Sequence, residues 1–135
     1  MEAPEDRLYS QHHLWVKMEN DQAVIGITDY AAEEIGEVDY IQLPEPNDIV
    51  SKEQTLGALE TSKAITDLIC PISGVVLDCN ILLNESPEMV TDDPYGDGWL
   101  VVLQPSDPDE WDDLMKAGDY IKLVRTEMQE QNPGS

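Results

Sequence analysis

Short apolar runs separated by turn residues follow one another along most of the chain. Each run is too short for a typical helix, and their regular spacing is typical of the strands of a β-rich domain. The 43–48 segment carries two prolines and cannot continue a central strand, and Ser73-Gly74 supplies a turn within a hairpin expected over 71–78. We therefore predict a mainly β sandwich or barrel. The predicted strands are 23–27, 38–43, 55–59, 64–69, 75–77, 99–103 and 120–124.

Helix-capping residues predict one clear helix at about 107–117. Ser106 and Asp109 have the spacing of a capping box, Pro108 is tolerated in a first turn, and Gly118 fits the position just after a last turn. The ordering of these signals predicts both ends of the helix.

Two shorter helical segments are expected. Thr28 or Asp29 can cap a helix over 30–35, with Gly36 at its end, and Ser86–Pro87 is typical of the start of a single further turn. A chain of 135 residues is long enough for one self-sufficient core. We expect an N-terminal extension over 1–8, one domain over 9–125, and a polar tail over 126–135 that frays.

The charge balance excludes several classes of function. Seven Lys and Arg residues against 29 Asp and Glu give a formal net charge of −22, which repels nucleic-acid phosphates and anionic lipid headgroups. Residues 1–20 contain no apolar signal segment, and no run is long enough to span a bilayer. We expect a soluble, cytoplasmic, monomeric protein that binds neither nucleic acid nor membrane.

Common catalytic and metal-binding motifs are missing from the sequence. There is no nucleophile elbow, zinc-protease helix, phosphate-binding loop or dinucleotide fingerprint. His12 and His13 are adjacent, so in an extended segment they point to opposite faces and cannot share a metal ion. Cys70 and Cys79 fit either buried small apolar positions or a thiol pair in redox chemistry.

Lys63 is the candidate functional residue. It lies in the sequence Glu-Thr-Ser-Lys-Ala between two predicted strands, so we expect it at the tip of a β-hairpin. A primary amine on a rigid projecting turn is suited to becoming an amide that carries a long flexible arm. Spacing alone also fits an ordinary solvated lysine.

In the block around Lys63 and in further blocks along the chain, the sequence resembles the lipoyl-carrying H-proteins of the glycine cleavage system. The resemblance extends from about residue 9 to 124. The resemblance implies a barrel-sandwich hybrid in which a hairpin presents a lipoylated lysine, and it implies a carrier that is not itself an enzyme. It gives Lys63 that role, with lipoic acid attached as an amide, and it gives Glu60 and Asp67 a part in recognition by the lipoate-attaching enzyme. The matching blocks are 13–17, 26–29, 43–44, 60–64, 71–74, 84–88 and 93–99.

Two departures from the family pattern bear on which metabolic pathway the carrier serves. The first block of glycine-cleaving members usually reads His-Glu-Trp, and its glutamate helps to hold an aminomethylated arm in a surface cleft. Here the block has Leu14 after His13, and Tyr30 stands where a histidine is usual. Loss of the carboxylate removes a charge-assisted bond to the cationic aminomethyl group, worth about 1.5–3 kcal/mol. We assign His13, Leu14 and Tyr30 to this arm cleft.

The altered cleft favours one branch of the family over another. It is similar to the lipoate-binding proteins of sulfur oxidation, whose partners are a heterodisulfide-reductase-like complex and dihydrolipoyl dehydrogenase. The alternative is a glycine cleavage carrier whose partners are glycine decarboxylase and aminomethyltransferase. A biotinylated or unmodified interaction module would share the fold, but biotin carriers typically have Met on both sides of the lysine, where this chain has Ser62 and Ala64.

Overall fold

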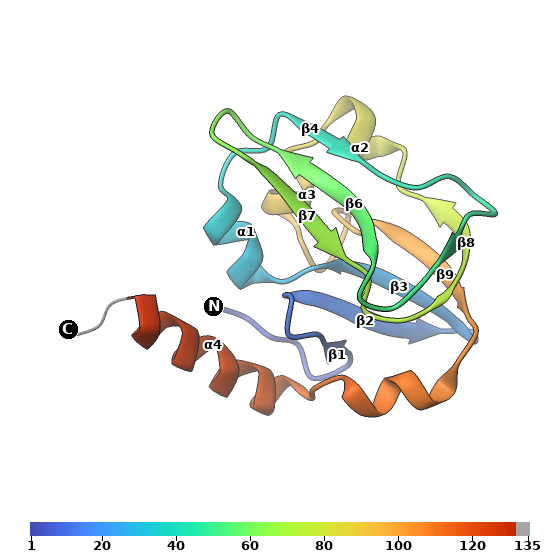
Figure 1. Cartoon of the computed structure of the whole chain (residues 1–135). Coiled ribbons are helices and arrows are strands. Elements are labelled where there is room, and N and C mark those ends of the chain that lie inside the picture. The colour runs from blue at the N-terminus through green and yellow to red at the C-terminus, as the bar shows by residue number, and fades with distance from the viewer. Residues whose placement is uncertain (132–135) are drawn as a thin grey trace.

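A computed structural model describes residues 1–131 and shows two antiparallel β-sheets with helices around them (Figure 1). This confirms the prediction of a mainly β fold. The strands are β1 (Leu8–Tyr9), β2 (Leu14–Glu19), β3 (Gln22–Ile27), β4 (Tyr40–Gln42), β5 (Ile49–Val50), β6 (Thr55–Glu60), β7 (Ile65–Ile69), β8 (Gly74–Cys79) and β9 (Val101–Pro105). The helices are α1 (Asp29–Ile35), α2 (Leu82–Glu85), α3 (Met89–Asp92), the 3₁₀ helix η1 (Pro108–Asp113) and α4 (Ala117–Gln131).

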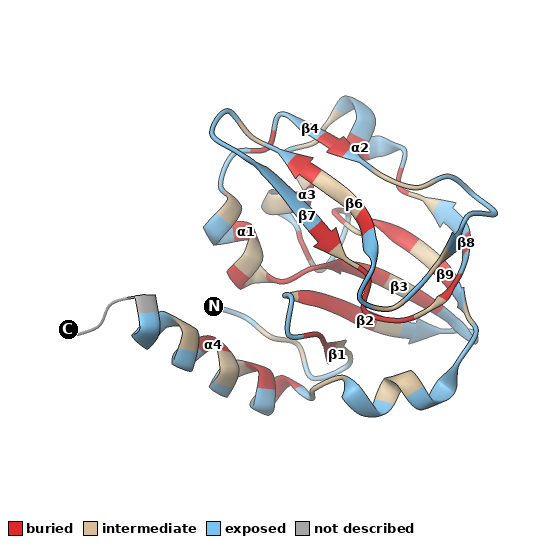
Figure 2. Ribbon diagram, in the orientation of Figure 1, coloured by how far each residue is buried: buried red, intermediate tan, exposed pale blue. Residues whose placement is uncertain are grey.

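The two sheets enclose the main hydrophobic core. The larger sheet has the order β1-β2-β3-β9-β8-β5 and the smaller one the order β4-β6-β7. Figure 2 shows buried segments on the strands where the sheets face each other. Fully buried members of this core include Ile25, Ile27, Leu59, Ile72 and Leu103. No helix among residues 1–131 is long and apolar enough to cross a membrane.

The prediction of a hairpin over 71–78 is wrong. β7 belongs to the smaller sheet and β8 to the larger one, so the chain changes sheets between them. Gly74 is the first residue of β8 rather than a turn residue. A Cβ built on Gly74 would lie 2.4 Å from the backbone oxygen of Gln104 on β9, so this glycine permits close approach of two strands.

The C-terminal segment differs most from the sequence prediction. The predicted helix at 107–117 is instead the 3₁₀ helix η1, capped by Asp107 rather than Ser106. Met115 then pairs with Tyr9 of β1 in a short extended bridge, which separates η1 from α4. Because α4 continues to Gln131, the predicted strand 120–124 and the part of the predicted tail from 126 to 131 are helical. Residues 132–135 lie outside the described part of the chain.

The shorter helices correspond more closely to their sequence signals. α1 is capped by Thr28, whose side chain accepts a hydrogen bond from the Ala31 N–H, and it ends at Gly36, which has a φ of 75°. Ser86 ends α2, and its carbonyl accepts a hydrogen bond from the Met89 N–H at 3.1 Å, so a helical turn does follow Ser86, although α3 itself begins at Met89. The prediction missed β1, β2, β5, α2 and α4.

Candidate functional site

Lys63 lies in the exposed turn between β6 and β7 (Figures 1 and 2). Thr61 holds this turn in shape: its N–H donates to the Ala64 carbonyl at 2.9 Å, and its Oγ1 accepts from the N–H groups of Lys63 and Ala64 at 3.2 Å each. The sequence prediction of a hairpin tip is confirmed. The turn is fixed by its own hydrogen bonds, while the lysine side chain projects from it.

The Lys63 ammonium group has no carboxylate within 4 Å among residues 1–131. By contrast, Lys17 and Lys52 both form ion pairs. Glu60 and Asp67 occupy the same hairpin but form no ion pair with the lysine. The structure therefore presents Lys63 as an exposed primary amine on a stiff support, which is the geometry that acylation requires.

A pocket of about 240 Å³ lies between α1, α4, β7 and the start of β2. It brings together His13, Leu14 and Tyr30, the three residues assigned to the arm cleft from the sequence. Asp67 also lines it, so the lysine hairpin forms one of its walls. Its floor is apolar, made by Leu14, Ile27, Ala31, Ile35 and Leu68.

Carboxylates surround this apolar floor. Glu34 of α1, Asp67 of β7 and Glu127 of α4 all line the pocket. Sequence reasoning did not assign Glu34 or Glu127 to the cleft. Glu34 follows Tyr30 by four residues and so lies on the same helix face, a spacing that could have indicated it. Glu127 carried no such signal, because it reaches the pocket only through the fold of α4.

A chain of hydrogen bonds fixes α4 against the pocket. The Tyr120 hydroxyl lies 2.6 Å from Thr28 Oγ1 and 2.8 Å from His13 Nδ1, and His13 Nε2 lies 2.8 Å from a Glu127 oxygen. One assignment gives every donor an acceptor: Thr28 donates to Tyr120, Tyr120 donates to Nδ1, and Nε2–H donates to Glu127. Burial raises the pKa of Tyr120, which keeps its hydroxyl proton in this chain. The Tyr120 ring also stacks on Tyr9 at 4.8 Å.

We expect Tyr120→Phe to lower the free energy of unfolding by about 1–3 kcal/mol. The change leaves the buried Thr28 hydroxyl and His13 Nδ1 without their shared partner while keeping the aromatic ring. Urea denaturation at neutral pH measures the loss. Tyr40→Phe, in which the hydroxyl removed belongs to an exposed residue, is the control and should be neutral. Equal stability of both variants would contradict a structural role for this hydrogen-bond chain.

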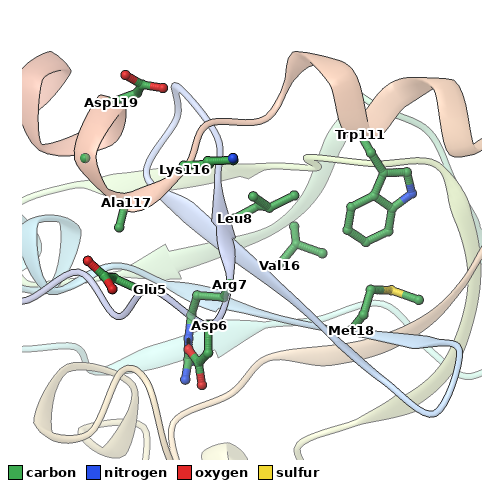
Figure 3. Close-up of a pocket in the computed structure, with 11 residues that line it drawn as sticks. Glu5, Asp6, Arg7, Leu8, Val16, Met18, Trp111, Lys116, Ala117 and Asp119 are labelled. Carbon is green, nitrogen blue, oxygen red and sulfur yellow. Dashed lines mark hydrogen bonds and ion pairs between the residues drawn. The ribbon is translucent and has the colours of Figure 1, made fainter.

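A second, larger groove does not involve the hairpin. It encloses about 840 Å³ between the N-terminal segment, β1, β2, η1 and the start of α4. Leu8, Val16, Met18 and Trp111 provide its apolar side chains (Figure 3). None of the residues singled out from the sequence as a candidate site lies in it.

The two cysteines are free and occupy different surroundings. Cys70 is buried, and its Sγ lies 3.0 Å from the Ile72 carbonyl. Burial raises the pKa of this thiol to about 11. The Cys79 Sγ lies 2.8 Å from the Pro44 carbonyl, and burial also raises its pKa. Neither thiol is activated, and no group of three or more potential ligands in residues 1–131 is placed to hold a metal ion.

Comparison with known proteins gives a consistent result. Residues 7–127 match the family model described as glycine cleavage H-protein. The chain belongs to this family. It is 40% identical to a glycine cleavage system H protein of Anaeromyxobacter over 92% of this chain and 97% of that protein. It is 44% identical to glycine cleavage system H protein 3, mitochondrial, of Arabidopsis thaliana, over 88% and 72% of the two chains.

A solved structure supports the same family at the level of the fold. The crystal structure of a glycine cleavage system H protein from Mycobacterium marinum superposes with a TM-score of 0.81 at 31% identity, covering 90% of this chain and 98% of that one. Glycine cleavage H-proteins are non-catalytic carriers that hold lipoate covalently on a lysine. As a member of the family, this chain is a lipoyl carrier rather than an enzyme.

Proposed function

We propose that Lys63 is the lysine that carries lipoate. The observation that supports this most directly is its exposed amine, which has no ion-pair partner in the described chain and stands on a turn fixed by Thr61. In the acylation, deprotonated Nζ attacks the carbonyl carbon of an activated lipoyl ester or anhydride. A C–N bond forms, the bond to the leaving group breaks with its electron pair, and Nζ loses a second proton as the amide forms.

The proposed pathway is glycine cleavage. The attached lipoate supplies a dithiolane that cycles between disulfide, substituted and dithiol forms. Our sequence-based preference for sulfur oxidation rested on Leu14 and Tyr30, and the comparisons do not support it: the family model and the relatives reported above bear glycine cleavage names. The corresponding partners are glycine decarboxylase, aminomethyltransferase and the lipoate-attaching enzyme. Location in the cytoplasm stays a prediction from composition.

The carboxylates of the cleft account for the missing glutamate at position 14. A cationic aminomethyl group needs a negative partner, and Leu14 supplies none. Glu34 and Glu127 reach the same pocket from two helices. Their side chains can hold a cationic group at the rim while the apolar floor takes the methylene chain of the arm. Carboxylates at other positions thus serve the function that the usual glutamate has in the family.

Loading with glycine tests the pathway. Lipoylated protein is incubated with glycine and glycine decarboxylase, and intact mass then measures the aminomethyl group gained. We expect efficient loading that depends on both glycine and the lipoyl group. Unloaded protein under conditions that load another glycine cleavage H protein would overturn the pathway and favour the sulfur branch. Absence of lipoyl mass on Lys63 after incubation with a lipoate ligase would overturn the attachment site itself.

A further inference from the structure

The outer face of the smaller sheet carries an exposed apolar pair beside the lysine turn. Tyr40 of β4 pairs with Glu60 of β6, and Glu60 pairs with Ile65 of β7. Residues directly opposite one another in neighbouring strands point to the same face. The next positions, Ile41 and Leu59, are buried in the core, so the row Tyr40–Glu60–Ile65 faces outward. Tyr40 is 58% exposed and Ile65 is 68% exposed.

This row is close to the Lys63 amine and is held in place. Ile65 follows Lys63 by two residues, a distance of at most about 7 Å along the backbone. Two strand spacings, roughly 10 Å, separate Tyr40 from Ile65. All three positions are in paired strands next to the turn that Thr61 fixes. The side chains are therefore presented at defined positions relative to the amine.

An enzyme that docks around the lysine turn covers this row. A specific protein interface buries about 800 Å² on each partner, which corresponds to a disc roughly 16 Å in radius. A disc of that size centred on the turn includes Tyr40, Glu60 and Ile65. Large apolar side chains, aromatic ones above all, contribute strongly to binding when a partner removes them from water.

Resting on the proposed role of Lys63, we propose that Tyr40 and Ile65 form the docking surface for the lipoate-attaching enzyme. The partner surface is apolar opposite these two side chains and cationic opposite Glu60. The next outward row supports this charge assignment, because Gln42 and Ala58 pair there with Asp67, a second carboxylate. A cationic rim on the enzyme is also attracted by the net charge of −22.

Acylation kinetics test the proposal. Purified unmodified protein is incubated with a lipoate–protein ligase, lipoate and ATP, and intact mass follows the gain of lipoyl group on wild type, Tyr40→Ser and Ile65→Ser. We expect each variant to lower kcat/KM about tenfold through a higher KM. Tyr40→Phe keeps the apolar ring and should restore most of the rate.

The matched control is Ile49→Ser, which removes an exposed isoleucine from β5 in the other sheet; Ile49 is 82% exposed. Its kcat/KM should stay within twofold of wild type, and all variants should keep the wild-type denaturation midpoint. Rates of Tyr40→Ser and Ile65→Ser within twofold of wild type, or an equal loss in Ile49→Ser, would overturn the docking surface and leave Lys63 as the attachment site. Wild-type protein that gains no lipoyl group would instead overturn the proposed function.

Discussion

Lys63→Ala is expected to abolish lipoylation and, with it, aminomethyl loading. No other side chain of the turn carries an amine, and the amide to lipoate cannot form without Nζ. The free energy of unfolding should change by less than about 0.5 kcal/mol, because the exposed side chain makes no ion pair with the described residues. Intact mass measures the first effect, the glycine-loading assay the second and urea denaturation the third.

Lys122→Ala is the control for this experiment. Lys122 is another exposed lysine, on α4, so its removal changes net charge equally and should leave lipoylation intact. Lipoyl mass on the Lys63→Ala protein would place the attachment elsewhere. Loss of folding in that variant would show that the lysine has a structural role.

Gly74→Ala is expected to lower the free energy of unfolding by about 1–3 kcal/mol or more. The added Cβ would lie 2.4 Å from the Gln104 oxygen and 3.3 Å from the Pro105 Cα. Both are backbone atoms of β9, so the strand pair itself has to shift, and that strain is the cost of overpacking. Urea or thermal denaturation measures the loss.

Gly118→Ala provides a matched comparison. A Cβ on Gly118 meets nothing within 4 Å, and the residue lies in the first turn of α4. The same substitution should therefore raise the free energy of unfolding by about 0.5–1 kcal/mol, because alanine restricts the unfolded chain. Effects of the same sign at Gly74 and Gly118 would contradict the assignment of close strand approach to Gly74.

The elements that local sequence identifies are those with local causes. The hairpin around Lys63 and the helix capped by Thr28 were predictable, because alternating strands and a side-chain cap act within a few residues. The C-terminal segment was not. Its apolar residues 120–124 fit a short strand as well as one face of a helix, and the choice was made by the packing of Tyr120 and Val124 against the N-terminal strands.

The candidate site, like the fold, could be predicted from the sequence only in part. The sequence identified His13, Leu14 and Tyr30 as neighbours through the resemblance, and the structure brings them into one pocket. The inference that Leu14 removes a charge-assisted bond considered only one aligned position and left the other walls of the pocket out of account. Glu127 enters from a helix that sequence reasoning did not predict, more than a hundred residues along the chain from Leu14. The charge of a pocket depends on all the residues that line it, and the tertiary fold decides which residues those are.

The hydrogen bonds that Thr61 makes across the turn give the tether a fixed origin. Since these hydrogen bonds fix the turn, the distance over which a group attached to Lys63 can move comes from the rotatable bonds in the side chain and its attachment. While the arm is outside the pocket, the volume that its distal end samples, and hence its effective concentration at a docked active site, is then set by the length and flexibility of the arm. A carrier with such a fixed turn would present every partner with the same effective concentration of the attached group, whatever the order in which the partners bind.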